Sequence, residues 1–177
     1  FFTVMATDAY GYTGSRAYSV TVTEALEAPV VTAHPEDRTV DEGGTAAFTA
    51  AASGNPAPTV QWQVSTDGGS TWDDVPGATE TTLTLTNVSP DMDGYRYRAV
   101  FTNSEGSVPS NDATLTVRPI YTVTFDAQGG SPTPAPQTVV SGDRASEPGE
   151  PTKDGYTFDG WFTDNTAYTD RWDFCSA

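Results

Sequence analysis

Apolar and polar residues alternate with a period of two along most of the segment from Pro29 to Val117, and no other feature constrains the fold as strongly. Such alternation is typical of a β-strand with one buried and one exposed face. One run places Phe48 and Ala50 on the same face, and turn residues such as Asp67-Gly68-Gly69-Ser70 separate the runs. Since no helical period lies between them, the pattern predicts an antiparallel β-sandwich over residues 30–118.

The composition supports an all-β chain and excludes several classes of function. Gly (16) and Pro (13) are plentiful and only 36% of the 177 residues are hydrophobic, as expected for short strands joined by turns. A net charge of −16 would repel nucleic acid and anionic lipid, and no apolar run approaches the roughly 20 residues of a membrane span. The single cysteine, Cys175, and single histidine, His34, exclude an internal disulfide and a histidine-based metal cluster.

The chain divides into three modules. Residues 1–24 hold two strands, predicted to be the last two of a partial β module, because a lone hairpin cannot bury a face stably. Residues 25–29 form a short acidic linker, the sandwich covers 30–118, and a third module covers 120–177. The first residues lack a signal peptide and the last lack a polar tail, so we expect a piece of a longer protein.

Two stretches carry a family resemblance within the sandwich. Phe48–Pro56 and Asp93–Asn103 resemble an immunoglobulin-like domain of the intermediate-set kind, with Trp62 as the tryptophan of its strand C. The resemblance implies that Tyr97 is the tyrosine-corner residue, two positions before the second conserved cysteine.

Alanines stand at both cysteine positions of that family, Ala50 and Ala99. The resemblance therefore implies a disulfide-free variant, common in large bacterial surface proteins, in which these two alanines face each other across the sandwich.

The flanking modules also resemble known families. Phe2–Asp8 and Tyr18–Val22 are similar to the last strands of a bacterial putative-Ig or cadherin-like module. Tyr121–Gly130 and Pro151–Asp164, with the Gly-Tyr-Thr-Phe-Asp-Gly-Trp-Phe run, resemble an InlB B-type repeat, also called the Listeria–Bacteroides repeat. That resemblance implies a small β-grasp-like fold, truncated before its closing strand. We expect its core to be aromatic, formed by Tyr156, Phe158, Trp161, Phe162 and Trp172.

Three carboxylates are weak candidates for calcium ligands. Asp91 and Asp93 alternate as in a calcium loop, but no downstream glutamate completes the ligand set, and a turn-shaping role is favoured. Asp8 stands where cadherin-like repeats place a ligand, although the linker offers only glutamates beside it. We therefore predict no metal and no other cofactor, with calcium as the open alternative.

Several residues are candidates for catalytic or sugar-binding sites, but simpler roles are favoured for them. Trp72 could stack on a sugar, but packing across the strand pair is the favoured interpretation. Asp73 and Asp74 are adjacent and so point to opposite sides, which disfavours a glycosidase pair. No nucleophile elbow, P-loop or H-E-x-x-H motif occurs, so the sequence predicts that the chain is not an enzyme.

These features predict a non-catalytic, modular fragment of a bacterial cell-surface or secreted protein. It would lie outside the cell or on the cell wall, as a stalk or display arm, with adhesion to a host or cell-surface protein or glycan as a further role. The alternative is an accessory region, carbohydrate-binding or spacer, of a large secreted glycan-active enzyme.

Overall fold

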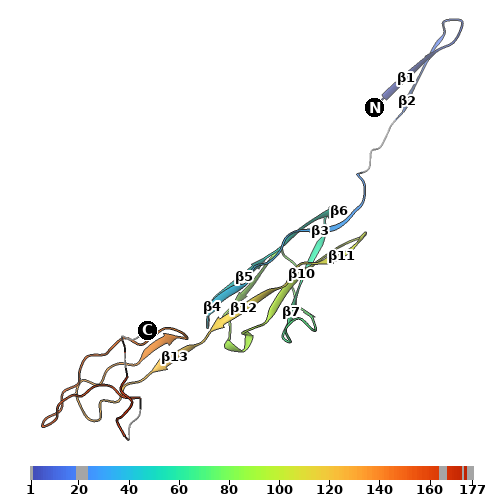
Figure 1. Ribbon diagram of the computed structural model, residues 1–177. Coiled ribbons are helices and arrows are strands. Elements are labelled where there is room, and N and C mark those ends of the chain that lie inside the picture. Colours follow the sequence, from blue (N-terminus) through green and yellow to red (C-terminus); the bar gives the residue numbers. More distant parts are fainter. Residues whose placement is uncertain (1, 19–23, 164–166, 173, 175–177) are drawn as a thin grey trace.

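A computed structural model describes residues 2–18, 24–163, 167–172 and 174, and nearly all regular structure in them is β (Figure 1). The described part contains one short 3-10 turn, Pro90–Met92, and no helix long and apolar enough to cross a membrane. The all-β prediction is confirmed. The strands follow one another as β1 Phe2–Thr7, β2 Thr13–Tyr18, β3 Glu27–Ala33, β4 Arg38–Asp41, β5 Thr45–Thr49, β6 Ala51–Asn55, β7 Thr59–Ser65, β8 Asp73–Asp74, β9 Thr82–Thr86, β10 Arg96–Asn103, β11 Gly106–Pro109, β12 Ala113–Arg118, β13 Ile120–Val123 and β14 Gln137–Val140.

Strands β3 to β12 build a sandwich of two layers (Figure 1). One sheet has the order β4-β12-β10-β7-β8, with β11 added to β10. The other layer consists of the pairs β3-β6 and β5-β9, and β5 and β6 are one strand interrupted at Ala50. This is the G-F-C and A-B-E arrangement of the immunoglobulin fold, so the predicted Ig-like domain is confirmed.

One strand pair departs from the predicted antiparallel scheme. β12 pairs with β4 in parallel, with Leu115 opposite Arg38 and Val117 opposite Val40. The cause is the chain's path: after β3, the segment around Pro35 carries it from one layer to the edge of the other, so β4 arrives in the same direction as β12.

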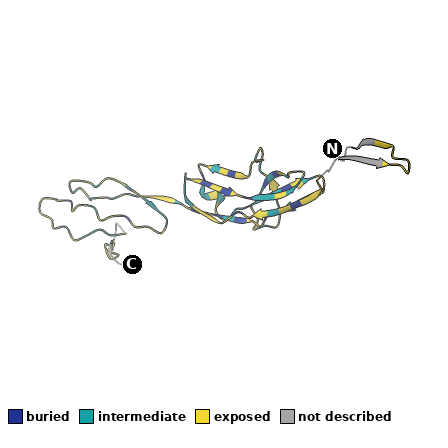
Figure 2. Cartoon of the chain, turned by 90° about the horizontal axis from the view of Figure 1, so that it is seen from above, coloured by how far each residue is buried: buried dark blue, intermediate teal, exposed yellow. Residues whose placement is uncertain are grey.

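The core of the sandwich forms where the two layers face each other, and Figure 2 shows buried residues concentrated there. Trp62 on β7 is fully buried and pairs in register with Ala99 on β10. Its indole nitrogen donates a 2.8 Å hydrogen bond to the backbone carbonyl of Glu80. The buried cluster comprises Ala46, Phe48, Ala50, Val60, Trp62, Leu83, Val88, Tyr97, Ala99, Phe101, Ala113, Leu115 and Val117.

Ala50 and Ala99 lie in this cluster with no exposed surface. The backbone N–H of Ala50 donates to the carbonyl of Thr81 at 3.0 Å, which keeps the interrupted strand attached to the β9 side. Both positions of the missing disulfide are therefore filled by apolar volume.

Tyr97 is packed by its ring. It stacks on Phe48 with ring centroids 5.0 Å apart and an interplanar angle of 28°, and only 2% of the residue is exposed. Burial, and then the neighbouring Tyr95, raise the pKa of Tyr97 to about 12, because the phenolate form would have to lose its hydration.

The N-terminal segment is a hairpin in which β1 and β2 pair from Phe2 opposite Tyr18 to Thr7 opposite Thr13. The predicted positions Val20 and Val22 lie outside the described residues. β3 already begins at Glu27, inside the segment predicted as the linker.

The C-terminal module has little regular structure. In its described residues, β13 pairs with β14, and two isolated bridges join Ser131 to Thr152 and Phe162 to Arg171. The β-grasp-like fold implied by the resemblance therefore stays a prediction.

The aromatic residues of this module are only partly gathered. Trp161 makes edge contacts with Phe125 and Phe158, at centroid distances of 5.3 and 5.5 Å. Tyr156 is 72% exposed and Trp172 is 37% exposed, so the core positions predicted for them are wrong. The Lys153 ammonium lies 4.7 Å from the Tyr156 ring centroid. The ring therefore contacts a cation at the surface and not a packed layer.

We expect Trp62→Ala to cost about 3–5 kcal/mol of the free energy of unfolding, because it empties the centre of the core and removes the partner of the Glu80 carbonyl. Urea unfolding followed by fluorescence of the remaining tryptophans measures the loss. Trp72→Ala, at a half-buried position, is the matched control and should cost clearly less. Equal costs would contradict the central place of Trp62.

Candidate functional site

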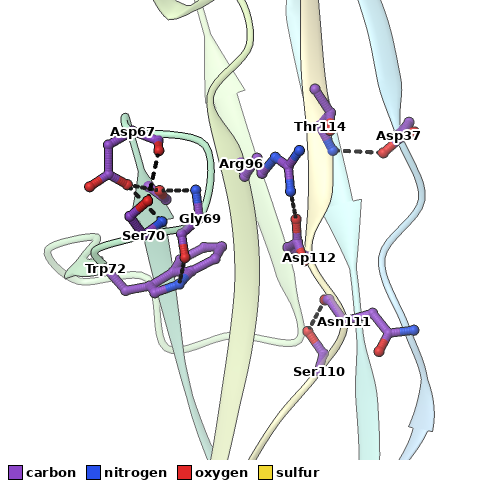
Figure 3. A network of polar contacts seen from close by, with 11 residues as sticks. Asp37, Asp67, Gly69, Ser70, Trp72, Arg96, Ser110, Asn111, Asp112 and Thr114 are labelled. Carbon is purple, nitrogen blue, oxygen red and sulfur yellow. Dashed lines mark hydrogen bonds and ion pairs between the residues drawn. The ribbon is translucent and has the colours of Figure 1, made fainter.

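The densest polar network in the described residues is the turn between β7 and β8, and Asp67 is its centre (Figure 3). One carboxylate oxygen, Oδ1, accepts hydrogen bonds from the Ser65 hydroxyl at 2.7 Å and from the backbone N–H groups of Ser70 and Thr71 at 2.9 Å each. The other, Oδ2, accepts from the Thr71 hydroxyl at 2.7 Å. These bonds hold the pKa of Asp67 well below its usual range, the two from Thr71 contributing most.

Local sequence explains why the turn closes in this way. Gly68 and Gly69 adopt φ of +75° and +99°, in the left-handed region that other residues rarely adopt. The turn places the Gly69 N–H 2.8 Å from the hydroxyl of Ser65, a residue only 1% exposed. The turn itself was predictable from the sequence, but the role of Asp67 was not predicted. The signal was an aspartate followed by two glycines and then by a serine and a threonine.

Trp72 faces a cation instead of open solvent. The Arg98 guanidinium lies 4.1 Å from the Trp72 ring centroid, and the indole N–H donates to the Gly69 carbonyl at 3.1 Å. Arg98 in turn donates to Gln63, which donates to Asp74, both at 2.9 Å. A sugar could stack on this face of the ring only by displacing the guanidinium, so the geometry favours packing.

A second polar group ties the start of the sandwich to β12 (Figure 3). Arg96 forms a 3.1 Å ion pair with Asp112, and Asp37 accepts the Thr114 N–H at 2.7 Å. His34 accepts the Asn111 N–H at 2.9 Å through Nδ1, which occupies that ring nitrogen in a structural bond.

Two of the three calcium candidates, Asp8 and Asp93, hold backbone groups in place. Asp8 accepts from the N–H groups of Tyr10 and Tyr12, at 2.9 and 3.0 Å, and so closes the β1–β2 loop. Asp93 accepts the Val117 N–H at 2.8 Å, linking the turn before β10 to β12. Asp91 is exposed beside it, and its own N–H lies 3.4 Å from the Ser89 hydroxyl.

No group of three or more acidic, histidine or cysteine side chains that could hold a metal ion occurs among the residues that the structure describes. Cys175 lies outside them. Asp73 and Asp74 are both exposed on the edge strand β8.

The C-terminal module contains a hollow of about 970 Å³. Aromatic residues such as Phe125, Phe158 and Phe162 line it, and the Trp161 indole nitrogen is buried beside them without a hydrogen-bond partner. Unfilled space next to an unpaired donor indicates a module whose packing is incomplete within these residues.

Asp67→Asn should destabilise the sandwich, because an amide nitrogen cannot accept the Thr71 hydroxyl bond. The pKa of Asp67 is lowered by folding, so the carboxylate's contribution is fully present above its unfolded pKa of about 4 and declines as the pH falls below it. The difference in urea midpoint between wild type and variant should therefore be full at pH 7 and shrink in acid. Asp73→Asn, on the exposed edge, is the control; a pH-independent difference for Asp67→Asn would contradict the ionic role.

Two parts of the chain match known family models. Residues 121–177 match the family model of the Listeria-Bacteroides repeat domain, and residues 32–119 match that of a domain of unknown function, DUF8696. Endoglucanase C of Cellulomonas fimi is 59% identical over 90 residues, which are 51% of this chain and 8% of that protein. Internalin H of Listeria monocytogenes is 34% identical over 100 residues, which cover 50% of this chain and 18% of that protein.

Solved immunoglobulin structures are also similar. A chimeric titin Z1Z2 structure shares 32% sequence identity, covers 54% of this chain and 99% of that one, and has a TM-score of 0.44. The fold assignment rests on strand order and core composition. The chain thus combines an immunoglobulin-like β-sandwich with a Listeria-Bacteroides repeat.

Proposed function

We propose that the chain is a non-catalytic structural region of a bacterial surface or secreted protein, where it acts as a stalk or display arm outside the cell. The observation that carries this proposal is the use of the sandwich's polar side chains. Asp67, Arg98 and Asp93 all hold neighbouring parts of the sandwich in place rather than lining a cleft. Polar side chains in these roles stabilise a module, which supports a structural function.

The path of the chain fits a serial arrangement of modules. β3 enters the sandwich at one end, and β12 leaves it at the opposite end towards β13 (Figure 1). Modules connected in this way extend along a line, so each added module increases reach.

The joint after the sandwich is short and bonded on both sides. Only Pro119 separates β12 from β13. Arg118 forms a 2.6 Å ion pair with Asp41, and the Ile120 N–H donates to the Glu42 carboxylate at 2.9 Å. Across the joint, the Ser141 N–H donates to the Pro119 carbonyl at 2.7 Å. These contacts support a stiff connection, which a stalk needs.

The charge supports an exposed, soluble arm. Acidic residues are spread over turns and linkers, and the net charge of −16 disfavours association with other acidic surfaces. Adhesion to a host or cell-surface protein or glycan is a finer proposal that would add a partner to the same arm.

A second candidate is favoured by the 59% identity to a stretch of endoglucanase C. In that case the sandwich is an accessory region, carbohydrate-binding or spacer, of a secreted glycan-active enzyme whose catalytic domain lies elsewhere. The two candidates share the non-catalytic role and differ in whether a sugar is bound.

Glu42→Ala should loosen the joint, because the Ile120 N–H loses its acceptor. Nuclear spin relaxation of the 177-residue chain would then report larger motion of β13 relative to β12. Glu42→Gln keeps an acceptor oxygen and serves as the matched control. Equal mobility in all three proteins would contradict a joint stiffened by this bond.

Sedimentation with insoluble cellulose and affinity electrophoresis with soluble β-glucans distinguish the two candidates. A stalk should stay in the supernatant and migrate unretarded. Saturable retention that is lost in Trp72→Ala would contradict a pure stalk and support the carbohydrate-binding accessory region.

A further inference from the structure

Strand β9, Thr82–Thr86, forms an open edge of the sandwich, since among the described strands it pairs with β5 alone. The bond from the Ala50 N–H to the Thr81 carbonyl fixes the alternation of this antiparallel pair. In that alternation Leu83 and Leu85 direct their backbone groups to β5, while those of Thr82, Thr84 and Thr86 point outwards. No turn or loop hydrogen bond among the described residues reaches the backbone of these three threonines.

The outer strands β3, β4, β8 and β11 carry the features that natural proteins use to prevent strand addition, namely charged residues or proline. β9 has neither; it consists of three threonines and two leucines. The protecting residues on the other edges are Glu27 and Pro29 on β3, Arg38 and Asp41 on β4, Asp73 and Asp74 on β8, and Pro109 on β11.

The space beside this edge is unfilled. A hollow of about 290 Å³ is lined by β9 and by the segment that leads into it, including Val75, Pro76 and Ala78. Leu85, on the same wall, is only half-buried although it points to the core side. Apolar side chains at an open edge would be covered if another strand lay against β9.

We propose that β9 pairs with β9 of a second copy of this chain, antiparallel and centred on Thr84. A two-fold contact requires a surface that matches itself, and Thr-Leu-Thr-Leu-Thr reads the same in both directions. Centred on Thr84, the pairing places Thr82 opposite the partner's Thr86 and Leu83 opposite the partner's Leu85. The outward N–H and C=O groups of the threonines then face one another on both strands, as an antiparallel ladder requires.

Charge favours this edge over the rest of the surface. Two copies with a net charge of −16 each repel one another, but residues 81–89 carry no charge. In the proposed register Glu80 lies opposite the partner's Val88, so no like charges meet. Because the repulsion is between distant surface charges, added salt should strengthen the pairing.

Sedimentation velocity of the 177-residue chain, over a range of concentrations at low and high salt, tests the proposal. We expect a monomer–dimer equilibrium that shifts towards the dimer as salt rises. Thr84→Lys brings two cations together on the two-fold axis and should weaken the dimer at least about tenfold. Thr116→Lys is the matched control, an exposed threonine on β12 between β4 and β10. It should leave the dimer unchanged.

Amide hydrogen exchange of the unmodified chain gives an independent readout that does not depend on a variant's folding. The Thr84 N–H should gain protection as concentration rises, while the Thr116 N–H should not change. A monomer at every concentration and salt, or a dimer equally strong with Thr84→Lys and without protection at Thr84, would overturn the proposal.

Discussion

The structure of the sandwich depends on the burial of Trp62. Trp62 makes three hydrogen bonds to the segment between β8 and β9, which crosses from one layer to the other. The Trp62 N–H donates to the Ala78 carbonyl and the Trp62 carbonyl accepts from the Val75 N–H, both at 2.9 Å. The indole N–H donates to the Glu80 carbonyl. The crossing segment then delivers the chain to β9 in the opposite sheet. Burying such a side chain removes roughly 150–250 Å² from water, an upper limit of about 4–6 kcal/mol. A disulfide contributes about 2–4 kcal/mol, so the core can replace it.

Sequence reasoning predicted the features that depend on alternation and on family resemblance. The alternation of apolar and polar residues predicted the strands. The buried positions from Ala46 to Val117 follow that alternation, because facing sheets bury every second residue of a strand. The parallel pairing of β12 with β4 was not predictable in this way, since direction depends on which layer β4 joins. The predicted core position of Tyr156 was wrong for another reason. An aromatic ring in a small module lies in a core only when enough neighbouring chain packs around it.

The roles of the candidate site residues were also only partly predictable from the sequence. The sequence pattern made Asp8, Asp91 and Asp93 weak candidates for calcium ligands. In the structure, however, the carboxylates of Asp8 and Asp93 accept hydrogen bonds from backbone N–H groups. Asp67, which was not marked, accepts four hydrogen bonds through its two oxygens. A carboxylate's role depends on which donors the turn directs towards it, and composition does not report that direction. The polar groups therefore stabilise an architecture, and the open edge of β9 is where the sandwich leaves backbone groups for another chain.

The sandwich folds without a disulfide because Ala50 and Ala99 fill the place of the two cysteines in its core. The double variant Ala50→Cys with Ala99→Cys, in a Cys175→Ser background, tests this most directly. If the two positions face each other as in the immunoglobulin fold, the thiols should oxidise to an intramolecular disulfide and the urea midpoint should rise. Two thiols that stay free in a folded, oxidised sample would contradict the register of β5–β6 against β10.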